Sequence, residues 1–111
     1  MEYKIITNSK VPQRLSIFID IYAITLYPYI FIKDEGNPIV INHEKIHLEQ
    51  QRELWLVGFY LLYVWYWLIS KVKGFSNTGA YHTIPFEREA YDKEEDMEYL
   101  NNRKKFAWRD Y

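Results

Sequence analysis

The sequence predicts an α+β domain that is dominated by helices and carries a small pair of strands. Three observations predict this class: a segment rich in Ile, Tyr and Phe, a long helical pattern after it, and a charged helical pattern near the end. The chain of 111 residues is long enough for one modest hydrophobic core. We therefore expect a single domain over residues 1–111.

Residues 15–33 favour strands, because they combine β-branched and aromatic side chains. Pro28 argues against one uninterrupted helix. We expect two short strands, Ile17–Thr25 and Tyr29–Lys33, with a break at Tyr27-Pro28. A membrane segment is the alternative for these residues, and Asp20 and Pro28 argue against that alternative.

A turn follows the strands and leads to a long helix. Asn37 can cap this helix with Pro38 at its first position, and Asn42 is an alternative cap. The pattern continues to about Val72, and roughly 30 helical residues would span about 45 Å. A straight helix of that length would protrude from a compact domain. We therefore expect it to bend near Gly58, to pack in a homo-oligomer or to enter a membrane.

The second half of this helix, Leu54–Ser70, contains no charged residue. It is slightly short for a comfortable membrane span. Its Tyr and Trp side chains gather towards the end that Lys71 and Lys73 follow, as in an interfacial belt. Three interpretations stay open: a buried core or oligomer helix, an interfacial anchor and a membrane span.

The remaining segments are a loop and a final helix. Lys73–Thr83 contains two glycines and is predicted to be a loop. Pro85 opens a charged helix that we expect to run to about Lys105. Its apolar residues form a broken stripe.

Composition narrows the classes of function. The chain has 14 basic and 15 acidic residues, so its net charge of −1 gives no reason to expect a nucleic-acid partner. The absence of cysteine excludes disulfides and thiolate metal sites, which leaves His, Glu and Asp as ligands. The first ten residues lack the apolar run of a signal peptide. We expect a cytoplasmic or membrane-associated protein.

The segment HEKIH, from His43 to His47, is the strongest chemical signal. Residues four apart lie on one face of a helix, so both imidazoles can bind one metal ion. Glu44 lies about 100° around the helix from His43, where it can act as a general base. HExxH thus combines two ligands and one base in one turn. The alternative is a solvated, charged helix start.

A catalytic zinc site needs a third protein ligand. The candidates are Glu87, Glu89, His82 and the acidic run Asp92–Asp96. Glu87 and Glu89 stand at the start of the last predicted helix. Glu87 follows His47 by 40 residues, which is far enough for the chain to reverse and pack a second helix against the first.

HExxH followed by a helix with Glu-x-x-Ala resembles the gluzincin metallopeptidases, above all the CAAX-type and heat-shock membrane proteases. In that family the first Glu of a Glu-x-x-Ala-Asp helix is the third zinc ligand. Glu87 matches that position in the segment EREAY. The family's aspartate, which supports a ligand histidine, falls at Tyr91, so either Tyr91 replaces it or Asp92 or Glu89 does. The chain also resembles small bacterial or phage HExxH proteins of unassigned role, which share an HExxHxxQQ helix and an FExEAY segment.

The resemblance implies a minimal zincin-like domain whose strand pair lies beside the active-site helix. It implies that His43, His47 and Glu87 hold Zn²⁺ and that the enzyme hydrolyses peptides. Glu44 would take a proton from the metal-bound water and pass it to the leaving amine.

The resemblance also implies how substrate is held. A strand beside the active-site helix binds extended peptide in such enzymes, and Ile21–Lys33 would play that part. Tyr81 and His82, in the predicted loop just before Glu87, are the candidates for stabilising an oxyanion; the alternative is that Tyr81 is a packed tyrosine and His82 a surface histidine. Gln50 and Gln51, one turn past His47, either orient a ligand or lie on a solvated helix face.

Two rival interpretations belong to other classes. One is a protein of the same fold that binds metal, or only keeps the shape, without turnover. The small size of the chain and the missing aspartate at Tyr91 favour it. The other is a membrane-associated protein, anchored through residues 54–70, in which the motif occurs by chance.

Overall fold

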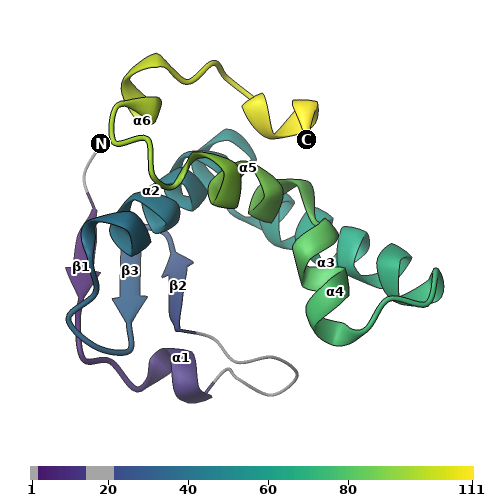
Figure 1. Ribbon diagram of the computed structural model, residues 1–111, viewed down its shortest axis with the longest axis horizontal. Helices are drawn as coiled ribbons and strands as arrows, with labels where there is room; N and C mark the ends of the chain where they lie inside the picture. The colour runs from purple at the N-terminus through teal and green to yellow at the C-terminus, as the bar shows by residue number, and fades with distance from the viewer. Residues whose placement is uncertain (1–2, 15–21) are drawn as a thin grey trace.

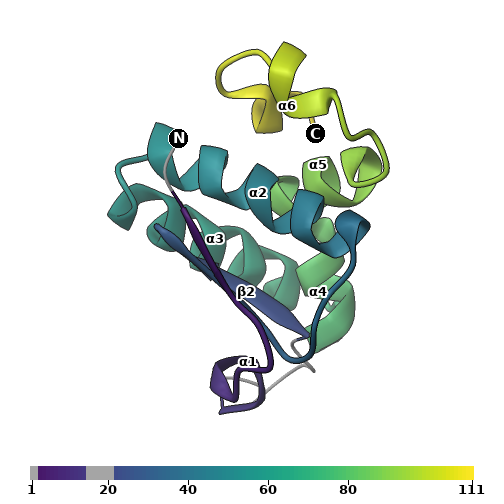
Figure 2. The same cartoon turned by 90° about the vertical axis from the view of Figure 1, so that its left-hand side faces the viewer.

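The computed structural model describes residues 3–14 and 22–111. Over this part of the chain the α+β class is confirmed, because several helices surround one small mixed sheet. Figures 1 and 2 show α2 in the middle, with the sheet on one side and α5 on the other. The elements in chain order are β1 (Lys4–Ile6), α1 (Val11–Arg14), β2 (Ala23–Leu26), β3 (Tyr29–Ile32), α2 (Pro38–Glu53), α3 (Val57–Val72), α4 (Asn77–Thr83), α5 (Pro85–Lys93), α6 (Tyr99–Asn102) and the 3-10 helix η1 (Ala107–Asp110).

The sheet has the strand order β1-β3-β2. β2 pairs antiparallel with β3, and the predicted break between them is confirmed at a cis Tyr27-Pro28 peptide. The first predicted strand, 17–25, is seen only as β2 from Ala23, because residues 15–21 lie outside the described residues. β1, which pairs parallel with β3, was not expected from its short and mostly polar surroundings.

Asn37 is the cap of α2. Its side chain accepts a hydrogen bond from the Val40 N–H at 2.9 Å, and Pro38 occupies the first helical position. The alternative cap, Asn42, lies within α2 instead, and its side chain is buried. Its amide donates to the backbone carbonyls of Glu94 and Asp96, at 2.8 and 3.0 Å, and so ties α2 to the end of α5.

The long predicted helix is bent close to Gly58, as in the first of the three alternatives. It stops at Glu53 and resumes as α3 at an angle of 110°. Trp55 and Leu56 have positive φ angles of 57° and 62°, which end the helix, and Gly58 lies inside the first turn of α3. The molecule measures 36 × 33 × 25 Å. A straight helix of about 45 Å would be longer than any of these dimensions, and the bend allows both halves to fit within them.

α3 packs on the rest of the molecule through one side only. Phe59 forms a core cluster with Ile84, Phe86 and Trp108. A second cluster, of β3 and α2 side chains, lies between the sheet and α2. The other side of α3 is exposed. Among the described residues no single helix is long and apolar enough to cross a bilayer, and α2 and α3 pass that test only together, as a bent pair.

Two predicted boundaries after α3 are wrong. The predicted loop 73–83 contains α4, because the Ser76 side chain accepts from the Gly79 N–H and caps a short helix there. The predicted helix 85–105 ends at Lys93 as α5. The carbonyls at its end bind the Asn42 amide, and the chain then turns back towards α2.

Candidate metal centre

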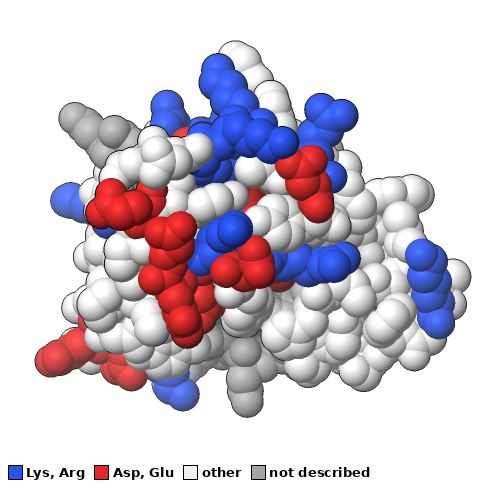
Figure 3. All heavy atoms as spheres, turned by 45° about the horizontal axis from the view of Figure 1, so that its top comes forward, with Lys and Arg blue, Asp and Glu red and all other residues white. Residues whose placement is uncertain are grey.

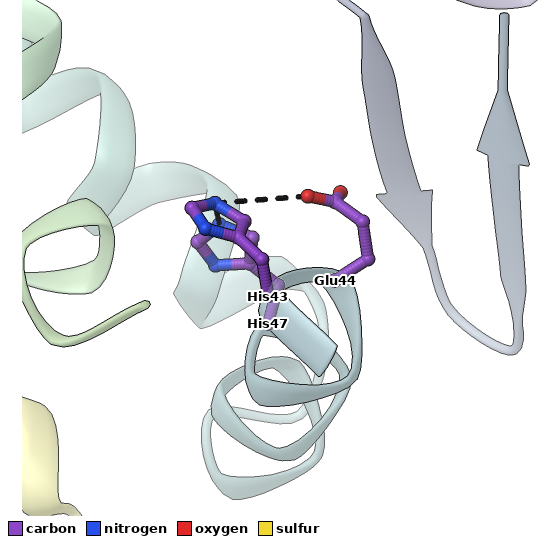
Figure 4. Close-up of side chains that lie close together, drawn as sticks. All are labelled: His43, Glu44 and His47. Carbon is purple, nitrogen blue, oxygen red and sulfur yellow. Dashed lines mark hydrogen bonds and ion pairs between the residues drawn. The ribbon is translucent and has the colours of Figure 1, made fainter. Parts of the chain in front are cut away.

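α2 brings His43, Glu44 and His47 together in the interior. All three side chains are buried, and one ligand atom from each lies within 4.8 Å of the others. Figure 4 shows the two imidazole rings side by side and the Glu44 carboxylate reaching towards His43 from the side of the strands. This group could hold a metal ion.

Glu87, at the start of α5, completes a tighter group with the two histidines. Its Oε1 lies 3.3 Å from Nε2 of His43 and 3.1 Å from Nε2 of His47, and the two nitrogens are 3.2 Å apart. Glu44 is set back, with Oε2 3.7 Å from Nε2 of His43. Three donor atoms therefore converge on one point, and the Glu44 carboxylate lies beside it.

Gln50 fixes the orientation of His47. Its side-chain nitrogen donates to the carbonyl of Phe86 at 3.0 Å and to Oε1 of Glu89 at 2.9 Å. Since both amide hydrogens are used there, its oxygen faces Nδ1 of His47 at 2.7 Å and must accept from it. Nδ1 of His47 therefore carries the proton, and Nε2 points towards Glu87. The interpretation of Gln50 and Gln51 as a solvated face is wrong, because both are fully buried.

Glu94 supports His43. Nδ1 of His43 lies 2.9 Å from Oε1 of Glu94. Glu94 belongs to the acidic run Asp92–Asp96, in which the sequence suggests a third metal ligand rather than a partner for a histidine. Tyr91 does not replace the expected aspartate by a hydrogen bond; its ring packs edge-on against His43 at 4.6 Å. Asp92 pairs with the neighbouring Lys93 at 3.5 Å, and Glu89 supports the other histidine through Gln50. Each histidine thus has its own hydrogen-bond partner on Nδ1.

β2 holds Glu44 in place. The hydroxyl of Thr25 lies 3.1 Å from Oε1 of Glu44 and 3.0 Å from its backbone carbonyl. Gln51 of α2 donates to the carbonyl of Thr25 in β2 at 2.7 Å and accepts from the N–H of Tyr27, just after the strand, at 2.9 Å. These bonds fix the sheet against α2 at the level of the carboxylate.

Two tyrosines donate to Glu87. The Tyr81 hydroxyl reaches Oε1 at 3.0 Å, and the Tyr63 hydroxyl reaches Oε2 at 2.8 Å. Tyr81 therefore reaches the site as expected. His82 packs against the rings of Tyr81 and Tyr91, at 5.0 and 5.3 Å, and lines an open hollow of about 450 Å³ beside Tyr91. Tyr63 was missed, because the apolar pattern around it gives no sign that its hydroxyl turns inward.

The electrostatics of the group reflect burial and close opposite charges. Burial lowers the pKa of His47, but the carboxylates of Glu87 and Glu44 outweigh it and raise the pKa to about 9. Burial raises the pKa of Glu87, but His47 and His43 outweigh it and hold this pKa well below its usual value. For Glu44 burial dominates and its pKa is raised, against the effect of the two histidines.

This arrangement can bind a cation and hold a proton acceptor next to it. A buried carboxylate with a raised pKa suits general base catalysis. Comparisons of the chain with protein-family models, with curated proteins and with solved structures gave no match.

Proposed function

We propose that the protein is a minimal zincin, which binds Zn²⁺ through His43, His47 and Glu87 and hydrolyses peptide bonds. The observation that carries this proposal is the set of separations of 3.1, 3.2 and 3.3 Å among the three donor atoms. Ligands at about 2.0–2.1 Å from a tetrahedral zinc ion lie about 3.3 Å from one another. Imidazole and carboxylate donors without thiolate also suit zinc, although other divalent ions accept them.

Glu44 is the proposed general base. A bound zinc ion would supply a Lewis acid that polarises a carbonyl and lowers the pKa of a water molecule. Thr25 orients the Glu44 carboxylate at 3.1 Å and burial raises its pKa, so Glu44 can take a proton from water and give it to the leaving amine. Tyr81, whose hydroxyl already points at Oε1 of Glu87, is the nearer of the two candidates for stabilising an oxyanion.

β2 provides a place for a peptide substrate. Among the described residues it is an edge strand of the sheet, as β1 is, and it contacts α2 beside Glu44. An extended peptide can add to such an edge by backbone hydrogen bonds. The scissile bond would then pass close to the Glu44 carboxylate.

Glu44→Gln tests the proposal. The amide keeps the size of the side chain but cannot accept a proton, so we expect zinc to be retained and hydrolysis to fall by about 10²–10⁴-fold. Cleavage of a mixed peptide library can be followed by mass spectrometry, with zinc content measured on the same samples. Glu49→Gln on the same helix is the matched control, since Glu49 forms only a surface pair with Arg52. Full activity of Glu44→Gln would exclude Glu44 as the base.

A second candidate is metal binding without turnover. The specific observation in its favour is the low exposure of the ligand residues: His43, His47 and Glu87 are 7, 5 and 4% exposed. Structural zinc sites are closed, whereas catalytic sites keep a position open to water and substrate. One zinc per chain with no cleavage by the wild type would favour this candidate.

Zinc binding should depend on pH. In the metal-free protein the pKa of His47 is about 9, so at pH 7 zinc must displace a proton from this side chain. Apparent affinity should therefore rise by up to about tenfold per pH unit until the pH reaches about 9. Calorimetric titrations in two buffers of different ionisation enthalpy would count the released protons. An affinity that does not change with pH would contradict this linkage.

A further inference from the structure

One side of α3 is an uncovered apolar surface. Its residues recur every three or four positions, or are adjacent, and so share one side of the helix. We name this surface the exposed α3 face; it consists of Val57, Leu61, Val64, Trp65, Leu68 and Val72. Leu61 is 68%, Trp65 59% and Val72 89% exposed. The residues that α3 buries lie on the opposite side of the helix and pack on α5 and η1. Such an extended exposed apolar surface marks an interaction site.

The chain segment that carries this face has basic residues but no acidic ones. Between Glu53 and Glu87 the chain has no acidic residue, and its only Lys or Arg residues are Lys71 and Lys73 at the far end of α3. On the side of the molecule that Figure 3 shows, which is not the side of the exposed α3 face, the end that carries α3 and α4 is white except for one blue patch at its tip. The surface therefore combines apolar side chains and tryptophan with a basic end.

We propose that the exposed α3 face docks on the surface of an anionic phospholipid bilayer. The apolar side chains would enter the boundary between headgroups and acyl chains, with tryptophan at the interface, where its ring is favoured. Lys71 and Lys73 would face anionic headgroups. A second copy of the chain is a poorer occupant, because a twofold contact brings this face against itself and the segment between Glu53 and Glu87 offers no carboxylate to the lysines.

Docking in this way would not cover the candidate metal centre, which lies on the other side of α3. Phe59 and Tyr63, on the opposite side of α3, contact Phe86 and Glu87 of the centre. The centre would therefore lie about one helix diameter, roughly 10 Å, above the membrane surface. The proposal goes beyond peptide hydrolysis and does not depend on it, since docking needs neither metal nor turnover.

Flotation with lipid vesicles tests the proposal. The purified full chain is mixed with vesicles of phosphatidylcholine that contain about 30% phosphatidylglycerol, or with phosphatidylcholine alone. We expect the wild type to float with the anionic vesicles, the pair Leu61→Asp and Trp65→Asp to lose at least about tenfold in partitioning, and Lys71→Gln and Lys73→Gln to lose about fivefold each. Met97→Asp, at an apolar residue 48% exposed outside α3, should change nothing.

Circular dichroism and light scattering on each variant separate docking from folding and self-association. Leu61, Trp65, Lys73 and Met97 are exposed and Lys71 is partly exposed, so the variants should keep the wild-type spectrum. A wild type that does not float with anionic vesicles overturns the proposal. So does a wild type that stays dimeric without binding lipid and becomes monomeric in the variant Leu61→Asp with Trp65→Asp, because a second copy would then be the occupant.

Discussion

Replacing Glu87 by alanine is expected to remove the bound metal. The wild type should purify with about one zinc per chain, and Glu87→Ala with almost none, because zinc sites in proteins need at least three protein ligands. Oε1 of Glu87 is the carboxylate oxygen that lies within 3.3 Å of both histidine Nε2 atoms. Inductively coupled plasma mass spectrometry on dialysed protein measures the ratio directly.

Glu87→Gln separates loss of a ligand from loss of structure. Tyr63 and Tyr81 now donate to the two carboxylate oxygens; in the variant the amide oxygen can accept from one of these hydroxyls and the amide nitrogen can donate to the other, but the amide is a much weaker zinc ligand. It should fold like the wild type and bind almost no zinc. Glu95→Ala, at an exposed position, is the matched control. Retention of zinc in both Glu87 variants, with loss in Glu44→Gln, would make Glu44 the third ligand instead.

The positions of the two histidines and of Glu87 could be predicted from the sequence, because each depends on local chemistry. His43 and His47 share a face by helical periodicity, and Pro85 sets the start of the helix that carries Glu87. Pairing two such helices needs only that the chain can reverse between them. The bend of the long helix was one of three alternatives that size left open, since a rod of its full length would protrude from the domain.

The partners of these ligands could not be predicted, because they depend on contacts between distant segments. Gln50 looks like a surface residue by its chemistry, and it is buried because α5 supplies two acceptors for its amide. Glu94 belongs to an acidic run that periodicity alone cannot orient, and only the turn at the end of α5 aims it at His43. The bend was expected near Gly58, but the positive φ angles of Trp55 and Leu56, which form it, could not be predicted, because such angles usually favour glycine.

The segment after α5 depends on Arg103. This guanidinium donates to Glu53 at 2.9 and 3.0 Å and to Glu89 at 2.5 and 3.1 Å. The side chains of Arg103, Glu53 and Glu89 are 4, 9 and 0% exposed. Arg103→Met should therefore lower the free energy of unfolding by about 3–5 kcal/mol, because it leaves two carboxylates buried without their cation. Urea unfolding of metal-free protein, followed by circular dichroism, measures this loss.

The effect should have a pH signature. Burial raises the pKa of Glu89, but hydrogen bonds from Arg103, Tyr99 and Gln50 outweigh it and lower this pKa below its usual value. Since the pKa of Glu89 is lower in the folded protein, the Glu89 carboxylate stabilises the fold fully above its unfolded pKa of about 4.5. This stabilisation is lost as the pH falls through the folded pKa. Arg103→Met should lose much of this acid dependence.

Two further variants decide whether unpaired charge is the cause. Arg109→Met, at an exposed residue of η1, should leave stability unchanged. Adding Glu89→Gln to Arg103→Met should recover part of the loss, because it removes one of the two stranded carboxylates. The recovery should be accompanied by wild-type zinc binding only if Gln50 still holds Nδ1 of His47, since Glu89 is the acceptor that turns the Gln50 amide towards it. A stability of Arg103→Met equal to that of Arg109→Met would mean that water replaces the guanidinium, and it would contradict the prediction that the two buried carboxylates depend on this cation.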